Sequence, residues 1–231
     1  AVLASLRLCN ADVIAVVELT SALRRRLESE FSAEYPHFVW TEREPGHFGI
    51  GLLSRHPLRN CSLVNYRLPS VPSIEAVVQL SADQSVHVIA THPRPPMDSW
   101  QYRMRNEHLW VLADRVRELQ AVDGRPVIVL GDLNLTPWSP IFGQFQKRAG
   151  LRSAAAGDGL EPTWYSRPGF PFGLVIDHVL YTDGVFRLSR EILGGNGSDH
   201  RPVRVGLQVF CPLSECGYCV RIESCTRRLW A

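Results

Sequence analysis

Short apolar runs separated by glycine, proline and polar residues recur along the whole chain. Residues 13–19 are apolar almost throughout, which is typical of a strand that is buried on both faces. The other runs have strand length and are bounded by turn-forming residues. They predict strands at residues 38–41, 49–54, 74–80, 86–91, 127–130, 175–181 and 203–209.

Longer segments between these runs have the spacing of amphipathic helices. Thr20 is a suitable N-cap for one of them, and Gly150 is a suitable stop for another. Many short strands with only a few helices between them predict a two-sheet sandwich flanked by helices. The predicted helices cover residues 1–10, 20–31, 99–120 and 140–149.

Length and composition fit one ordinary globular domain. The chain has 231 residues, of which 45% are hydrophobic and 21% are charged. A formal net charge of +2 is smaller than that of dedicated nucleic-acid binders, but it is compatible with a phosphate-bearing substrate. No apolar run is long enough to span a bilayer, and no basic-then-apolar leader is visible. The default expectation is a monomeric cytoplasmic domain, although a segment upstream could carry an anchor or a signal.

One break in organisation falls near residue 210. Residues 1–210 are predicted to form the domain, and residues 211–231 are predicted to be a poorly ordered tail. A Cys-x-x-Cys pair in this tail could help to hold zinc, but the outer two cysteines lack finger spacing and no histidine lies nearby. The role of the four cysteines stays open; they are Cys211, Cys216, Cys219 and Cys225.

Polar residues stand where the apolar strands stop. Strand ends are rigid, so side chains there can be aimed into a shared cleft. Each residue alone has a structural explanation: Asp132 could form an Asx-turn, and a lone histidine is more often a hydrogen-bonded structural residue. Several such groups at the ends of buried strands are hard to explain in this way. They are Glu18, Thr91, His92, Asp132, Asn134, Asp177, His178, Ser198, Asp199 and His200.

This set of groups suits the hydrolysis of a phosphoester. Carboxylate oxygens bind Mg²⁺ or Mn²⁺, which neutralises charge on the phosphate and on the leaving oxygen. Another carboxylate can orient the attacking water, while imidazole and amide donors stabilise the phosphoryl oxygens. Metalloproteases, nucleoside triphosphatases with a phosphate-binding loop and serine hydrolases are disfavoured, because the sequence motifs of these three classes are missing.

In this order and spacing, the motifs resemble those of the endonuclease/exonuclease/phosphatase superfamily, which has the deoxyribonuclease I-like fold. The resemblance extends from about residue 12 to residue 209, and residues 131–140 look like a bacterial branch. It implies an α/β (α+β) fold, a four-layered sandwich of two mainly antiparallel sheets flanked by helices, with the cleft at one end of both sheets. Its strongest pieces are Gly131-Asp132-Leu133-Asn134 and Ser198-Asp199-His200.

The resemblance also implies a role for each motif residue. Asp132 positions the water, while Asn134 and His92 contact the phosphate. His200 binds or protonates near the phosphate, and Asp177 orients its imidazole. The implied ligands of Mg²⁺ or Mn²⁺ are Glu18 and Asp199.

The sequence departs from the family at its start. The family begins with a strand that carries a metal-binding asparagine, upstream of the helix before the glutamate strand. Here residues 1–10 already read as that helix, and Asn10 lies in the wrong element to substitute. The first strand is therefore expected to be missing, which would expose sheet edges and remove a metal ligand.

The family acts on DNA, RNA, inositol phosphates and sphingolipids, so the substrate stays open. A nucleic-acid or nucleotide phosphodiester is favoured, because Trp138 and Trp164 could stack on a base or sugar, although they could equally pack the loops. Arg94, Arg103 and Arg105 could reach phosphates or be merely solvated. The alternatives are an inositol- or lipid-phosphate phosphoesterase and, from another class, an inactive pseudoenzyme or phosphate-binding module.

Overall fold

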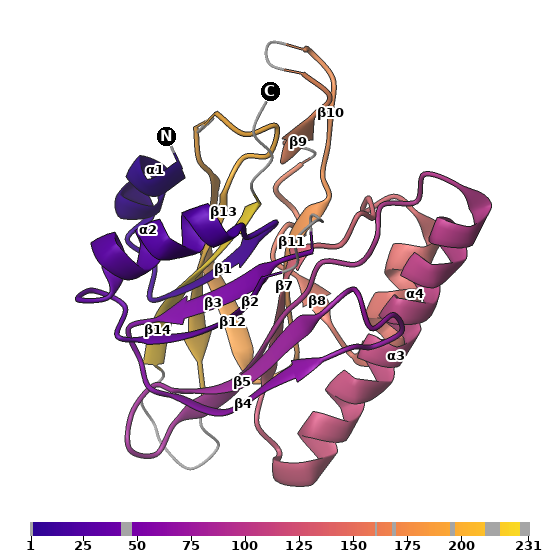
Figure 1. The fold of residues 1–231 in the computed structure, drawn as a ribbon. Coiled ribbons are helices and arrows are strands. Elements are labelled where there is room, and N and C mark those ends of the chain that lie inside the picture. The colour runs from indigo at the N-terminus through magenta and orange to yellow at the C-terminus, as the bar shows by residue number, and fades with distance from the viewer. Residues whose placement is uncertain are drawn as a thin grey trace.

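The computed structural model describes residues 2–42, 48–159, 161–167, 170–194, 197–210 and 218–226. Two six-stranded sheets lie face to face in this part of the chain, and helices cover their outer faces (Figure 1). The first sheet has the order β12 (Val185–Ile192), β13 (Val203–Val209), β14 (Tyr218–Thr226), β1 (Val13–Val17), β3 (Ile50–Ser54), β2 (His37–Thr41). The second has the order β4 (Leu58–Val64), β5 (Ser73–Gln79), β6 (Ser85–Ala90), β7 (Val127–Asp132), β11 (Asp177–Tyr181), β8 (Arg152–Ser153).

Both sheets are mixed but mainly antiparallel, as expected from the family resemblance. Strand β1 is parallel to β14, and β6 is parallel to β7, whereas the other described neighbours are antiparallel. A separate two-stranded ribbon, β9 (Trp164–Tyr165) and β10 (Gly173–Leu174), stands above the sheets near the cleft. No helix in the described ranges is both long and apolar enough to cross a membrane.

Four helices supply the outer layers. Helices α1 (Val2–Cys9) and α2 (Ser21–Phe31) pack on the first sheet, and Thr20 caps α2 by accepting a hydrogen bond from the Leu23 N–H. Helices α3 (Ser99–Asp123) and α4 (Pro140–Ala149) pack on the second sheet, and the predicted stop at Gly150 is confirmed by its left-handed backbone. A third apolar cluster, rich in valine and isoleucine, fills the space between the two sheets.

Two long edge strands, β4 and β12, and the two-residue edge strand β8 lie outside the predicted strands. Strand β4 borders the second sheet and β12 borders the first, and most of their side chains are partly or fully exposed. Both strands also contain a register shift of the kind made by a β-bulge. A strand that buries little surface needs no apolar run, so periodicity could not identify these two segments.

The predicted tail contains a strand in the centre of a sheet. Residues 218–226 form β14, which pairs in parallel with β1 and antiparallel with β13. The expectation of a poorly ordered segment is therefore corrected for these residues, and the gap expected beside the glutamate strand is filled. The sequence Tyr-Cys-Val-Arg-Ile-Glu-Ser-Cys-Thr has alternating apolar positions, with Val220 and Ile222 buried between the sheets. Cys211 and Cys216 lie outside the described residues.

The sheet topology brings the chemically interesting strand ends to one edge. Strands β6 and β7 are parallel, so His92, just after β6, and Asp132, the last residue of β7, lie at the same end of the sheet. Strand β11 runs antiparallel to β7, and its first residue, Asp177, pairs with Asp132. The register alone thus places two carboxylates from distant parts of the chain side by side.

Candidate active site

The turn after β7 is shaped by a close approach between two strands. Gly131 has φ of 139°, and a Cβ at this position would lie 2.0 Å from the Thr91 carbonyl oxygen. Only glycine allows this contact, and it draws the Gly-Asp-Leu-Asn segment against the end of β6. The Leu133 N–H then donates to the Ile176 carbonyl oxygen at 2.9 Å, which ties the same turn to β11. Asp132 is consequently held rigidly between two neighbouring strands.

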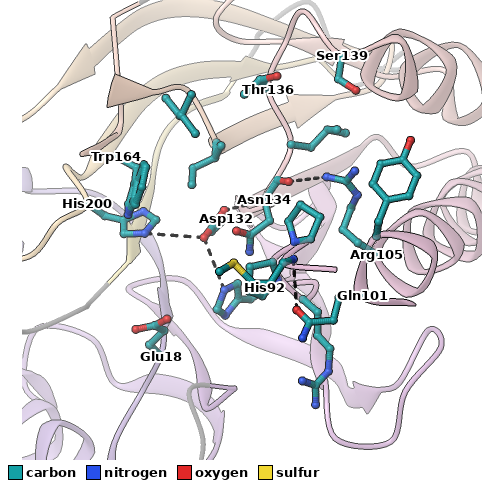
Figure 2. A pocket seen from close by; sticks show the side chains of 18 of the residues that line it. Glu18, His92, Gln101, Arg105, Asp132, Asn134, Thr136, Ser139, Trp164 and His200 are labelled. Carbon is teal, nitrogen blue, oxygen red and sulfur yellow. Dashed lines mark hydrogen bonds and ion pairs between the residues drawn. The ribbon is translucent and has the colours of Figure 1, made fainter. Parts of the chain in front are cut away.

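A buried network of two carboxylates and two imidazoles forms the centre of the site. Nδ1 of His200 lies 2.8 Å from Oδ2 of Asp177, and both side chains are almost fully buried. Oδ2 of Asp132 lies 3.9 Å from Nε2 of His200 and 3.6 Å from Nε2 of His92 (Figure 2). The Asp177 contact to Nδ1 leaves Nε2 of His200 facing Asp132, which fixes the tautomer and the direction of the ring.

Charge in this network is unbalanced. Burial and the nearby Asp177 carboxylate raise the pKa of Asp132 to about 8. Burial alone would lower the pKa of His200, but the attraction of Asp177, Asp132 and Asp199 raises it to about 9. The protein therefore holds His200 as a cation paired with Asp177, and without a bound cation it favours the protonated form of Asp132 near neutral pH.

Asn134 is fixed by three backbone or side-chain contacts. Its φ is 49°, a left-handed conformation that asparagine tolerates better than most residues. Its backbone N–H donates to Oδ1 of Asp132 at 2.7 Å, and its Nδ2 donates to the Pro93 carbonyl oxygen at 3.0 Å. Arg105 donates from Nη1 to the Asn134 carbonyl oxygen at 2.5 Å. This residue therefore links the β7 turn, the segment after β6 and helix α3.

Trp164 and Thr163 connect the β9 segment to the centre. Nε1 of Trp164 donates to Oδ2 of Asp199 at 3.0 Å, and its ring packs edge-on against His200 with the centroids 6.5 Å apart. Oγ1 of Thr163 accepts hydrogen bonds at 3.0 Å from the N–H groups of Ile176 and Asp177. The contacts of Trp164 and Thr163 position the site carboxylates Asp199 and Asp177. The indole N–H of Trp164 is therefore already used in a hydrogen bond within the protein.

The donor set fits a divalent cation with oxygen ligands. Ligand atoms of Asp132, Asp177 and His200 lie within 4.8 Å of one another, and while His200 is protonated only the two carboxylates can bind a cation. Oδ1 of Asp199 is buried and accepts no hydrogen bond from the described residues. A buried carboxylate oxygen without a donor, next to further buried carboxylates, is an environment that Mg²⁺ or Mn²⁺ would stabilise.

The network opens into a cleft with a volume of about 660 Å³. Glu18 lines this cleft with a left-handed backbone, φ 56°, and its carboxylate raises the pKa of Asp132 further. Figure 2 shows Glu18 and His200 on one side of the cleft and Gln101 and Arg105 on the opposite side. The lining residues also include Phe48, Arg94, Pro95, Pro96, Met97, Tyr102, Thr136, Ser139, Leu174 and Ile176.

The structure brings most of the sequence-predicted site residues together. Glu18, His92, Arg94, Asp132, Asn134, Trp164 and His200 line the cleft, and Asp177 and Asp199 contact lining residues from behind. Trp138 does not line the cleft: it is 54% exposed in the turn before α4, while its neighbours Thr136 and Ser139 face inward. His178 also points away, because its Nε2 donates to the Leu135 carbonyl oxygen at 2.7 Å, and burial lowers its pKa to about 4.

Gln101, Tyr102 and the apolar segment 95–97 were not predicted as site residues. They lie downstream of Thr91-His92, so their position after a polar strand end is the available signal. Arg105 was considered only as one of several arginines near a helix start, yet it is 3% exposed and lines the cleft. Arg103, two residues earlier, is exposed and does not line it.

Comparisons with known proteins agree with this geometry. The sequence profile of the Endonuclease/Exonuclease/phosphatase family matches residues 1–200. D. rerio TDP2 complexed with single-strand DNA product is 18% identical, with a TM-score of 0.73 over 89% of both chains. The human Nocturnin catalytic domain with bound sulfate is 16% identical, with a TM-score of 0.70 over 86% of this chain and 81% of that one. The 3′ phosphatase NExo from Neisseria, bound to product DNA hairpin, is 18% identical, with a TM-score of 0.64 over 84% and 98%.

A comparison with curated protein sequences gives no match. The two-sheet sandwich flanked by helices is the deoxyribonuclease I-like fold. The chain belongs to the endonuclease/exonuclease/phosphatase family. Members of this family hydrolyse phosphoesters and generally depend on a divalent metal.

Proposed function

We propose that this chain is a divalent-metal-dependent phosphodiesterase that acts on nucleic acid or nucleotides by attack of water on phosphorus. The observation that carries the proposal is the Asp132–His200–Asp177 network at the base of the cleft. A divalent cation bound beside Asp132 would favour its ionised form, and a phosphate with its cation is the complementary partner of this network.

Each residue has a separate task in this proposal. Asp132 orients the attacking water and accepts its proton, since its carboxylate is fixed by the Asn134 N–H and faces the cleft. His200, held as a cation by Asp177, donates to a phosphoryl oxygen from Nε2. His92 approaches the same carboxylate from β6 and contacts the phosphate from the opposite side.

Glu18, Asp199 and the Asp132 carboxylate would hold Mg²⁺ or Mn²⁺. The cation would neutralise developing charge on the phosphoryl and leaving oxygens. Trp164 keeps Asp199 oriented for this task through its Nε1 hydrogen bond.

Two kinds of observation support a nucleic-acid or nucleotide substrate. The cleft combines arginines with aromatic and apolar side chains, which suits nucleosides and their phosphates. Two of the similar structures, D. rerio TDP2 and Neisseria NExo, contain DNA product. An inositol- or lipid-phosphate substrate is the alternative within the same chemistry, and a phosphate-binding module without turnover is the alternative outside it.

The first test is hydrolysis of bis(p-nitrophenyl) phosphate by the purified chain with Mn²⁺ or Mg²⁺, with EDTA as the control. We expect turnover that requires the metal. A second panel compares an oligothymidylate, an inositol polyphosphate and sphingomyelin vesicles under the same conditions, with the oligothymidylate cleaved fastest. Absence of turnover on every substrate by folded, metal-loaded protein would contradict the proposal and favour the binding module.

A further inference from the structure

Arg105 is a buried cation in the wall of the cleft. It lies on the inner face of α3 and is 3% exposed, yet it contributes to the cleft surface. Its Nε donates to Oδ1 of Asn106 at 2.7 Å, and its Nη1 donates to the Asn134 carbonyl oxygen at 2.5 Å. Tyr102 lies beside it, with the guanidinium carbon 5.3 Å from the ring centroid. All of these partners are uncharged.

No carboxylate among the described residues forms an ion pair with Arg105. Other arginines of the chain are paired: Arg115 binds Glu75 at 2.8 Å, and Arg148 binds Asp114 at 2.6 Å. Burial without a carboxylate lowers the pKa of Arg105. Burying a guanidinium away from water without a counter-charge is costly. A buried Arg105 in the cleft wall therefore indicates that an anion bound in the cleft supplies the counter-charge.

The guanidinium has donors available for such an anion. Its two hydrogen bonds within the described residues use Nε and Nη1, and Nη2 has no partner there. A planar guanidinium presents parallel N–H groups that match the oxygens of a phosphate. The anion that fits these donors is therefore a phosphate group that enters through the cleft.

The position of Arg105 separates this anion from the phosphate that is hydrolysed. Asp132 binds the Asn134 N–H, and Arg105 binds the Asn134 carbonyl oxygen, so Asn134 lies between the two (Figure 2). Arg94 also lines the cleft; within the described residues it donates to Oγ of Ser70 and forms no ion pair with a carboxylate. The cleft thus has a hydrolytic centre rich in carboxylates and, beyond Asn134, a side rich in unpaired arginine.

The geometry points to a second phosphate subsite at Arg105, which binds a phosphate of the substrate next to the one that is attacked. This inference rests on the proposed function and narrows it. The substrate class is a nucleotide or oligonucleotide with at least two phosphates, rather than an isolated phosphodiester. Pro95, Pro96 and Met97 line the cleft as well and offer apolar surface to the nucleoside.

The test uses pairs of substrates that differ by one phosphate. One pair is thymidine 5′-(p-nitrophenyl phosphate) with and without a 3′-phosphate, and the other is thymidine 3′-(p-nitrophenyl phosphate) with and without a 5′-phosphate. Together they cover both chain directions. The readout is the ratio of kcat/KM within each pair, so a general loss of activity in a variant cancels.

We expect the wild-type chain to prefer the bisphosphate member of one pair by roughly tenfold, mainly through a lower KM. Arg105→Gln should reduce this ratio to about one, and Arg105→Lys should keep part of it because the charge remains. Arg103→Gln is the matched control on the same helix, and it should keep the wild-type ratio. Equal rates within both pairs for wild type, or a preference that survives in Arg105→Gln, would overturn the subsite.

A binding measurement separates this inference from the proposed function. Thymidine 3′,5′-bisphosphate is titrated into the wild-type and Arg105→Gln chains in EDTA by calorimetry, with thymidine 5′-monophosphate as the reference ligand. Tighter binding of the bisphosphate that Arg105→Gln removes would support the subsite even if no substrate is hydrolysed. Equal affinity for the two ligands in a chain that does hydrolyse phosphodiesters would refute the subsite alone.

Discussion

The wall of the cleft formed by the ends of β1, β7 and β11 carries carboxylates, whereas the wall formed by α3 and the segment before it carries arginines. On the first wall, Asp132 and Asp177 lie side by side and share one imidazolium, His200. On the second wall, Arg94 and Arg105 have no carboxylate partners among the described residues. The carboxylates could have neutralised the arginines, but the fold keeps the two sets apart.

This separation shows what each wall is suited to bind. A wall of surplus carboxylates holds cations, and a wall of unpaired guanidinium groups holds anions. A phosphate chain with its divalent cation carries both charges and spans both walls. Internal pairing would stabilise the apo protein, and it would remove the charge that recognises the substrate.

Replacement of the groups at the centre of the carboxylate wall should abolish turnover. We expect Asp132→Ala and His200→Ala each to lower kcat on bis(p-nitrophenyl) phosphate by roughly 10³-fold. The unfolding midpoint of Asp132→Ala should stay the same or rise, because burial and the neighbouring Asp177 make the ionised form of Asp132 unfavourable in the folded chain. Asp83→Ala, in the exposed turn between β5 and β6, is the control and should keep full activity. Wild-type rates in either site variant would remove that residue from the mechanism.

The indole donor to Asp199 should tune the affinity for the metal. Trp164→Phe keeps the ring against His200 but deletes the Nε1 hydrogen bond to Asp199. We expect the Mn²⁺ concentration for half-maximal activity to rise about tenfold, as is typical when a metal ligand loses its supporting hydrogen bond. Trp138→Phe, outside the cleft, should leave this concentration unchanged. An equal response of both variants would show that the effect is not specific to Asp199.

Beneath the arginine wall, one histidine is expected to make stability depend on pH. His108 on α3 is buried, its Nε2 lies 2.8 Å from Oγ1 of Thr91, and burial lowers its pKa to about 3. The unfolded chain takes up this proton near pH 6.5 and the folded chain does not, so stability falls as the pH drops below about 6.5. Between pH 7 and pH 5 this residue alone should cost about 2 kcal/mol.

Urea unfolding at the two pH values measures this contribution. His108→Gln should lose less stability on acidification than wild type, by about 2 kcal/mol. His37→Gln, on the half-exposed edge strand β2, is the control exchange and should behave as wild type. The same pH dependence in wild type and His108→Gln would show that other groups cause the acid sensitivity.

The buried strands and the centre of the site could be predicted because their signals are local. Apolar runs predict β1, β7 and β13, and the polar residues next to such runs predict Asp132 and His200 as site residues. The edge strands β4 and β12 could not be predicted, because exposed strands carry no apolar run. The central strand β14 has alternating apolar positions, but its cysteines and its place after the last apolar run are typical of a tail.

The arginine wall could have been found from one further signal. Arg105 occupies the same helical face as Leu109, Leu112 and Val116, which pack in the core. An arginine on the apolar face of an amphipathic helix must be buried, and a buried arginine needs an explanation. Which wall it faces and whether a carboxylate meets it depend on tertiary packing, which the spacing of residues along α3 does not contain.

Strand β14 sets a condition on the order of folding. It lies between β1 and β13, yet it follows both of them along the chain. During synthesis, the facing edges of β1 and β13 therefore have no partner until residues 218–226 leave the ribosome. The first sheet, and with it the position of Glu18 at the end of β1, can be completed only after translation has reached this strand.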